Sequence, residues 1–232
     1  MSYNREDYLK KRIIVTDLDG TLIDSAGRHV TVMEELLWNE ELQYTDDIKA
    51  QFDGASFMDY KASGKSGRDY LTDILGLTPD CAKRISEKWK DKVEQDIYLS
   101  EDKLYADSIN FLNTFFSECG VVFLTARRNR GGLEGELKRL NILGFADYVI
   151  VADPAKAAAD KEKAVTVLKK EYPDAEIFIV GDTENEFELA AKTGYKAFIL
   201  NRGFRNRAFW EAKNVKSYDG LDAVIKDIRR AK

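Results

Sequence analysis

The chain has 232 residues, 44% of them hydrophobic, with 36 basic and 41 acidic side chains and a formal net charge of -5. This length allows one or two domains with a sizeable core, and the negative balance disfavours nucleic acid as a bulk partner. Cys81 and Cys119 lie far apart and form no CxxC motif, so neither a disulfide framework nor a thiolate zinc site is indicated. The single histidine, His29, excludes sites built from several histidine ligands.

Residues 1–12 are polar and charged and lack the apolar segment of a signal peptide. Elsewhere, no run approaches the roughly 20 apolar residues that a membrane span requires. We therefore expect a soluble, cytoplasmic protein without a membrane or nucleic-acid partner. The sequence does not choose between a monomer and a homodimer.

The first predicted strand covers residues 13–16 and runs into the sequence DLDGT at residues 17–21. Successive strand side chains point to opposite faces, so Asp17 and Asp19 share one face. Two carboxylates this close repel, which raises one pKa unless a cation binds them or they share a proton. The pair indicates either a bound divalent ion or a division of roles between a nucleophile and an acid. Two solvated aspartates in a strand-to-loop turn are the alternative.

The segment 25–103 shows helical patterns and no clear strand. A long helix is predicted to open at Thr78-Pro79-Asp80, because proline is favoured in the first turn. Its apolar stripe indicates helix–helix packing. We expect a helical domain inserted after the first strand, placed over the edge of the sheet where it excludes water. The stripe comprises Cys81, Ile85, Trp89, Val93 and Ile97, and an earlier helix is marked by Val30, Met33 and Leu37.

Four further apolar runs predict strands, and helical patterns separate them. This alternation is typical of an α/β fold with a parallel sheet and helices on both faces. Ligands of such sheets bind beyond the carboxyl ends of the strands, where Asp17, Thr125, Asp153, Asp182 and Asn201 are expected. The four strands cover residues 121–124, 148–152, 177–180 and 197–200, and the helices cover residues 130–141, 161–172 and 186–193.

Two motifs at strand ends resemble those of the haloacid dehalogenase (HAD) superfamily. They are DLDGT at residues 17–21 and VVFLT, which ends in Thr125. The resemblance is to the beta-phosphoglucomutase and phosphoglycolate phosphatase-like branch, and it implies a Rossmann-like core with an inserted helical cap. The core would comprise residues 1–24 and 104–232, and the cap residues 25–103.

Two later motifs follow in the order of the same superfamily. The third is a lysine that opens a helix, best matched by Lys161, with Lys156 and Lys163 as rivals. The fourth is GDTENE at residues 181–186, in which Glu186 replaces the family's usual aspartate. The resemblance implies that Glu186 orients metal-bound water as that aspartate would, although the departure from the pattern leaves this role open.

The resemblance also implies the roles of the strand-end residues. Asp17 would be the nucleophile that forms an aspartyl-phosphate, and Asp19 would protonate the leaving group and then deprotonate water. Mg²⁺ would be held by Asp17, the backbone carbonyl of Asp19 and Asp182. Thr125 and Lys161 would bind the phosphoryl oxygens.

Five residues are candidate substrate contacts. His29 lies where beta-phosphoglucomutase-like members carry a histidine near the cap hinge, with a packed or solvated histidine as the alternative. Lys65, Ser66 and Arg68 lie in a stretch that resembles the family's cap loop. Arg127 follows Thr125 and could add positive charge, with a solvated helix start as the alternative.

We therefore expect an Mg²⁺-dependent phosphatase that acts on a small phosphorylated metabolite. The first alternative is a sugar phosphomutase of the same superfamily, although mutase-like members tend to have Glu-Asp where this chain has Gly181-Asp182. The second is a phospho-acceptor signalling module, which is much shorter and has no DxDGT motif.

Overall fold

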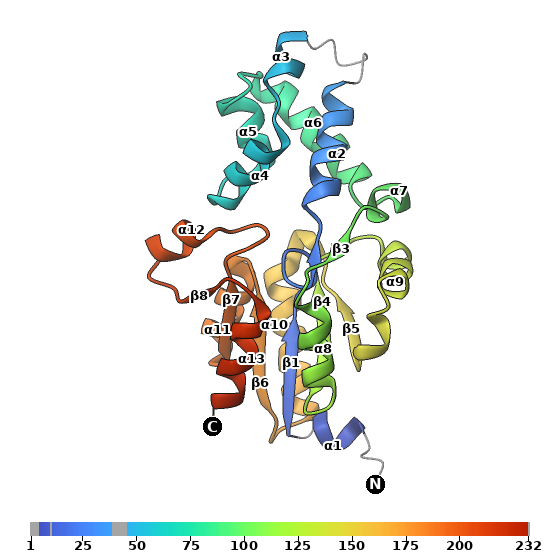
Figure 1. Cartoon of the computed structure of the whole chain (residues 1–232), viewed down its shortest axis with the longest axis vertical. Coiled ribbons are helices and arrows are strands. Elements are labelled where there is room, and N and C mark those ends of the chain that lie inside the picture. Colours follow the sequence, from blue (N-terminus) through green and yellow to red (C-terminus); the bar gives the residue numbers. More distant parts are fainter. Residues whose placement is uncertain (1–4, 10, 39–45, 232) are drawn as a thin grey trace.

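The computed structural model describes residues 5–9, 11–38 and 46–231. Its core is a six-stranded parallel sheet with the strand order β5-β4-β1-β6-β7-β8 (Figure 1). The predicted α/β fold and its five strands are confirmed, whereas the sixth strand, β8, was not predicted because two residues show no alternation. In chain order the strands are β1 (Arg12–Thr16), β4 (Gly120–Thr125), β5 (Tyr148–Val151), β6 (Glu176–Gly181), β7 (Lys196–Leu200) and β8 (Ser217–Tyr218).

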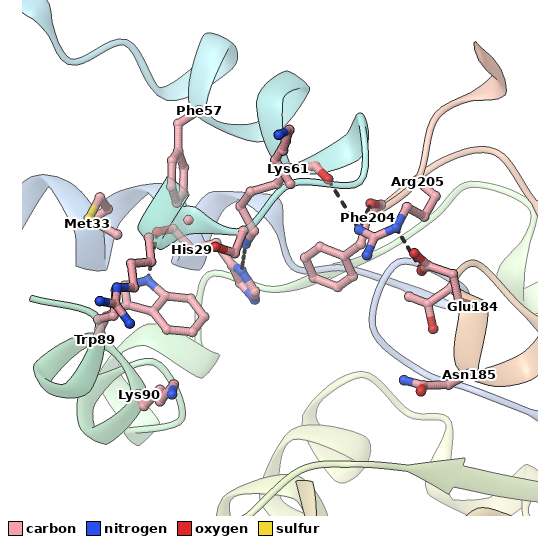
Figure 2. A pocket seen from close by; sticks show the side chains of 16 residues that line it. His29, Met33, Phe57, Lys61, Trp89, Lys90, Glu184, Asn185, Phe204 and Arg205 are labelled. Carbon is pink, nitrogen blue, oxygen red and sulfur yellow. Dashed lines mark hydrogen bonds and ion pairs between the residues drawn. The ribbon is translucent and has the colours of Figure 1, made fainter. Parts of the chain in front are cut away.

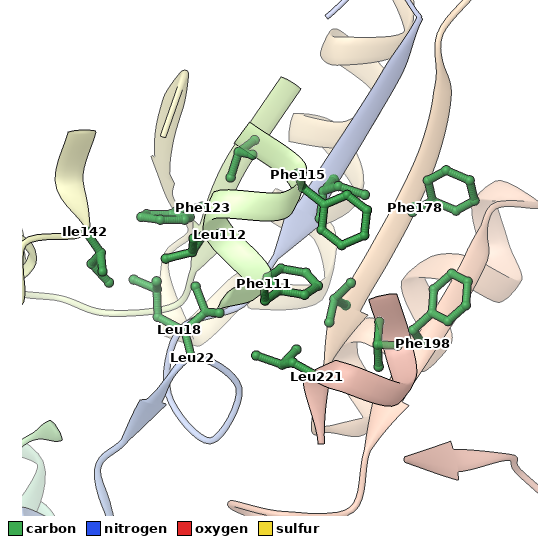
Figure 3. Packing of buried hydrophobic residues seen from close by; sticks show 14 of the residues in the cluster. Leu18, Leu22, Phe111, Leu112, Phe115, Phe123, Ile142, Phe178, Phe198 and Leu221 are labelled. Carbon is green, nitrogen blue, oxygen red and sulfur yellow. The ribbon is translucent and has the colours of Figure 1, made fainter. Parts of the chain in front are cut away.

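Helices cover both faces of the sheet, because the strand side chains alternate between two apolar clusters. Ile14 of β1 packs in the cluster that includes Phe111 and Leu221 (Figure 3), whereas Ile13 and Val15 pack in the opposite cluster. The core helices are α1 (Arg5–Leu9), α8 (Ser108–Phe116), α9 (Arg130–Arg139), α10 (Ala157–Glu171), α11 (Glu184–Thr193), α12 (Arg207–Ala212) and α13 (Leu221–Arg230), with short 3-10 turns at Leu143–Phe145 and Pro154–Lys156.

Six helices lie together beyond the carboxyl ends of the strands (Figure 1) and share an apolar cluster of their own. Two linkers join these helices to the core. The linkers pair with each other as the antiparallel strands β2 (Ile23–Asp24) and β3 (Lys103–Leu104), which were not predicted. The predicted division at residues 24/25 and 103/104 falls at these linkers and remains a prediction. The helices are α2 (Ala26–Leu37), α3 (Asp46–Gln51), α4 (Gly54–Ala62), α5 (Gly67–Asp73), α6 (Pro79–Lys92) and α7 (Asp96–Leu99).

The long helix α6 begins where the sequence predicts. Thr78 is its N-cap, with the Oγ1 atom accepting a hydrogen bond from the backbone N–H of Cys81, and proline follows in the first turn. The helix ends at Lys92, so the expected continuation of the apolar stripe to Ile97 is wrong. Ile97 lies on α7 and is 70% exposed, because a turn after Val93 changes the direction of the chain before it.

Candidate active site

The loop after β1 brings Asp17 and Asp182 together. The backbone N–H of Asp17 donates to the carbonyl of Val180 at 3.0 Å, which aligns the ends of β1 and β6. Gly20 adopts a φ of 72°, a conformation that glycine takes without strain. A Cβ atom on Gly20 would lie 2.2 Å from Oδ2 of Asp182. Glycine therefore allows the DLDGT loop to approach the Asp182 carboxylate closely.

Three carboxylates and one ammonium group form the centre of the site. Asp17, Asp182 and Glu186 each offer an oxygen within 4.8 Å of the others, and Nζ of Lys161 lies 3.3 Å from Oδ1 of Asp17. Burial, together with the charges of Glu186 and Asp19, raises the pKa of Asp17 to about 7 although Lys161 opposes the shift. Burial also raises the pKa of Asp182 well above its ordinary value.

This donor set fits a divalent cation. If all three carboxylates were ionised, the one lysine would leave two negative charges uncompensated in a buried site, which agrees with the raised pKa values of Asp17 and Asp182. A divalent ion would neutralise both charges. Carboxylate oxygens are the ligands that Mg²⁺ prefers. Asp17 and Asp182 would hold the ion with the backbone carbonyl of Asp19, whose role as a ligand remains a prediction.

Lys161 is the one of the three candidate lysines that reaches the cluster. It lies in the second turn of α10 and is 2% exposed, whereas Lys156 and Lys163 are exposed. Burial opposes its charge, but Asp17 and Glu186 outweigh this and raise the pKa of Lys161, so its ammonium stays charged. It supplies the fixed positive charge next to Asp17.

Glu186 uses both carboxylate oxygens. Its Oε1 atom lies 2.5 Å from Nζ of Lys161, and its Oε2 atom accepts from Oγ1 of Thr183 at 2.7 Å at the start of α11. A Cβ on Gly181 would lie 2.1 Å from Cγ of Glu186. The longer side chain thus orients Lys161 and caps the helix, while the predicted role with metal-bound water remains a prediction.

The Asp19 side chain points away from this cluster and toward two arginines. Nε and Nη2 of Arg127 lie 2.7 and 2.8 Å from its two carboxylate oxygens, and Arg28 pairs with it as well. Burial opposes ionisation, but the two guanidinium groups hold the pKa of Asp19 far below its usual range. In this arrangement Asp19 is ionised and has no proton to donate. It can hold and donate a proton only after its carboxylate separates from the arginines.

Arg28 and Arg127 belong to a buried ionic cluster that sequence reasoning missed. Arg127 is 3% exposed and also pairs with Glu136 on α9, so a solvated helix start is wrong, while substrate contact by Arg127 remains a prediction. Asp102, on the second linker, contacts both guanidinium groups. Glu136 lies beside Leu133 and Leu137 on the buried face of its helix. A charged residue within this apolar stripe was the one feature of the sequence that could have indicated a buried ion pair.

The remaining predicted residues line two adjoining cavities. The smaller, of about 240 Å³, contains Asp17, Asp19, Thr125 and Lys161 in its lining. The larger, of about 740 Å³, extends along helices α2, α4 and α6 (Figure 2). Its lining includes Lys65, Ser66 and Arg68. Both are lined by His29, Trp89 and Phe204. Ser66 also caps α5, with its Oγ atom accepting from the N–H of Asp69.

His29 is packed at the boundary of the two cavities, so the solvated alternative is wrong. Its side chain lies between Trp89 and Phe204, with ring centroids 4.9 Å away in each case. Burial and the charges of Lys61 and Arg28 lower the pKa of His29 well below its ordinary value. Its Nδ1 atom lies 2.7 Å from Nζ of Lys61. When Lys61 is charged it donates there, and the neutral ring then carries its hydrogen on Nε2.

Comparison with known proteins shows the family and the fold of the chain. The family model described as haloacid dehalogenase-like hydrolase matches residues 11–194. No curated protein matches the chain. No helix of the described residues has the length and apolar character of a membrane span.

Solved structures share the fold over nearly the whole chain. A haloacid dehalogenase-like family hydrolase from Streptococcus pneumoniae has a TM-score of 0.70 and 18% identity, covering 93% of this chain and 97% of its own. A predicted phosphatase from Clostridium acetobutylicum has a TM-score of 0.68 and 15% identity, covering 95% and 99%. A predicted phosphoglycolate phosphatase from Haemophilus somnus has a TM-score of 0.65 and 16% identity, covering 94% and 98%. The matched family model spans most of the chain, which confirms the expected superfamily: this protein belongs to the haloacid dehalogenase-like hydrolases.

Proposed function

We propose that the chain is an Mg²⁺-dependent phosphatase that hydrolyses a small phosphorylated metabolite through an aspartyl-phosphate on Asp17. The carrying observation is the Asp17 carboxylate at the end of the central strand, 3.3 Å from the Lys161 ammonium and beside two further carboxylates. A nucleophilic carboxylate needs nearby positive charge to approach a phosphate dianion. Lys161 supplies part of it, and a divalent ion at the acidic cluster supplies the rest.

In the first half-reaction an oxygen of Asp17 attacks phosphorus, and the bond to the leaving oxygen breaks. The electron pair passes to that oxygen, which takes up a proton from Asp19, and Asp19 regains one in the second half-reaction. In the second half-reaction water attacks the phosphorus of the aspartyl-phosphate and regenerates Asp17, and Asp19 accepts the proton of the water. When bound, Mg²⁺ would offset the charge of the phosphoryl oxygens. Lys161 and Thr125 would orient those oxygens in the smaller cavity.

The state of Asp19 fits the second half-reaction best. Its two arginine partners keep it ionised, so it can accept a proton, but they also weaken it as a base until a guanidinium group moves away. Arg28 belongs to the first helix after the linker, so a movement of the helical domain would change the environment of Asp19. Release from Arg28 is then the step that lets Asp19 carry a proton to the leaving oxygen.

The space around Gly181 supports the proposed phosphatase rather than a mutase. Mutase-like members tend to carry glutamate where this chain has Gly181. A Cβ there would collide with the Glu186 side chain at 2.1 Å, so a glutamate does not fit beside the glutamate that this chain already uses.

The test is phosphate release from a panel of phosphorylated metabolites, with Mg²⁺ and with excess chelator. We expect Mg²⁺-dependent turnover that Asp17→Asn abolishes. Asp153→Asn is the matched control, because Asp153 also follows a strand of the sheet but is exposed and caps a 3-10 turn. Equal turnover by Asp17→Asn and wild type would contradict the proposal.

A further inference from the structure

Lys61 is half-buried and presents its ammonium group to the larger cavity. It lies at the end of α4, and no ion pair joins its Nζ atom to an acidic side chain among the residues that the structure describes. The ammonium lies 5.2, 5.3 and 5.0 Å from the ring centroids of Phe57, Trp89 and Phe204. Burial and the charges of Arg28 and Arg205 lower the pKa of Lys61 to about 7. An added negative charge would therefore stabilise the charged ammonium.

The cavity around Lys61 is strongly cationic. Its lining contains five basic side chains and one acidic side chain, Glu184. That glutamate is already paired with Arg205, whose Nε atom lies 2.8 Å from it. The cavity thus has an excess of positive charge that no protein group in its lining offsets.

Phe204 connects this cavity directly to the catalytic carboxylates. Its backbone N–H donates to Oδ2 of Asp182 at 2.7 Å, while its ring lies beneath the Lys61 ammonium (Figure 2). Two hydrogen bonds hold the end of α4 to the same loop. Nη1 of Arg205 donates to the carbonyl of Lys61 at 3.2 Å, and the backbone N–H of Asn206 donates to the carbonyl of Ala62 at 2.9 Å. A leaving group that extends from Asp17 past Phe204 would meet Lys61.

We propose that Lys61, His29 and the aromatic walls around them recognise a second anionic group on the leaving part of the substrate. The inference rests on the proposed phosphatase function and narrows its substrate class. That class is a phosphate monoester whose leaving group joins an apolar or aromatic body to a carboxylate or a second phosphate. Lys61 pairs with the anion, and the rings of Phe57, Trp89 and Phe204 pack against the apolar body.

Matched aryl phosphates test the inference on the wild-type protein. The probes are phenyl phosphate, 4-carboxyphenyl phosphate, 1,4-phenylene bisphosphate and 4-(aminomethyl)phenyl phosphate, assayed with Mg²⁺. We expect at least one anionic probe to exceed phenyl phosphate in kcat/KM by about 10–100-fold, because a charge-assisted hydrogen bond in a buried site has this effect. The carboxylate and bisphosphate probes distinguish the two sources of the anion. The cationic probe should be the poorest.

Variants then assign the preference to Lys61. Lys61→Met should reduce the ratio of kcat/KM for the anionic probe to kcat/KM for phenyl phosphate to about threefold or less. The change should come mainly from a higher KM for the anionic probe, because a binding contact is lost. Lys61→Arg should retain part of the preference. Lys83→Met is the control, because Lys83 lies on the exposed side of α6 and pairs loosely with Glu87 at 3.9 Å. Should Lys61→Met fail to fold, wild-type inhibition by 4-hydroxybenzoate, compared with 4-hydroxybenzamide, measures the same preference.

The outcomes separate the two proposals. No phosphate release from any of the four probes with Mg²⁺ would count against the phosphatase function itself. Release without a preference for either anionic probe, or a preference for the cationic probe, would overturn the anion site and leave the phosphatase function standing. An unchanged preference in Lys61→Met would overturn the assignment to Lys61.

Discussion

Replacing Arg127 with methionine should destabilise the protein strongly. The guanidinium group is the partner of three carboxylates at once, since it binds both oxygens of Asp19, pairs with Glu136 and lies 3.4 Å from Oδ2 of Asp102. Glu136 has a 1% exposed side chain, and its Oε1 atom has no hydrogen-bond partner among the described residues. Removing Arg127 would leave a buried carboxylate without a counter-charge.

The expected loss follows from that burial. Breaking a buried ion pair by removing one partner costs about 3–5 kcal/mol, a large part of the roughly 5–15 kcal/mol that stabilises a typical protein. Arg28 still pairs with Asp19, so Glu136 accounts for most of the loss. The double variant Arg127→Met/Glu136→Gln should therefore recover about 1–3 kcal/mol, because the amide lacks the unpaired charge.

Urea unfolding followed by far-UV circular dichroism measures both effects as shifts in the midpoint at constant slope. Arg130→Met is the control, because Arg130 is exposed at the start of α9, and its free energy of unfolding should stay within about 0.5 kcal/mol of wild type. A loss below about 1 kcal/mol for Arg127→Met, or a double variant no more stable than the single one, would refute the reasoning.

Three further predictions concern separate parts of the molecule. Asp102 has a pKa raised to about 9, chiefly by burial, and a carboxyl in the unfolded chain titrates near pH 4. The folded state binds the extra proton between these values, so wild-type stability falls with rising pH by up to about 1.4 kcal/mol per unit. As the pH rises from 5 to 8, the free energy of unfolding of Asp102→Asn in urea should increase relative to that of wild type. A difference between the two proteins that does not change with pH would contradict this. Gly20→Ala places a methyl group 2.2 Å from Oδ2 of Asp182 and should displace this carboxylate. The Mg²⁺ concentration for half-maximal activity should therefore rise about 10–100-fold. An unchanged concentration would contradict this and show that the carboxylate moves freely. Burial raises the pKa of the Cys119 thiol to about 12. Iodoacetamide at pH 8 should therefore modify Cys81 in the native protein and both thiols in urea, as measured by mass spectrometry. Rapid labelling of Cys119 in the native protein would contradict this.

The parts of the fold that the sequence predicts are those with local patterns. The five longer strands are apolar runs, of which β1, β4, β6 and most of β7 are buried, whereas the edge strand β5 is partly exposed. The polar residues that follow these strands lie at one edge of the sheet. The short strands β2, β3 and β8 were missed because each is two residues long and is defined by its pairing. The end of α6 was missed because Ile97 continues the spacing of its stripe after the backbone has turned.

The site divides in the same way. Asp17, Lys161 and Asp182 were predicted because each stands in a motif with a fixed place at a strand end or helix start. The cluster around Asp19 could not be predicted, because Arg28, Asp102, Arg127 and Glu136 come from four separate segments. No spacing along the chain encodes such a pairing. The three aromatic rings around Lys61 were missed for the same reason. Phe57 on α4, Trp89 on α6 and Phe204 in the loop after β7 are far apart in the sequence and meet only in the folded protein.

The most direct test of the account is to trap the covalent intermediate. Wild-type protein is mixed with Mg²⁺ and a radiolabelled substrate found in the phosphate-release panel, quenched rapidly in acid, and digested for mass spectrometry. The account predicts phosphate on the peptide that contains Asp17, released by hydroxylamine as an acyl phosphate is, and absent from Asp17→Asn. Phosphate trapped on a different residue, or full turnover by Asp17→Asn, would contradict it.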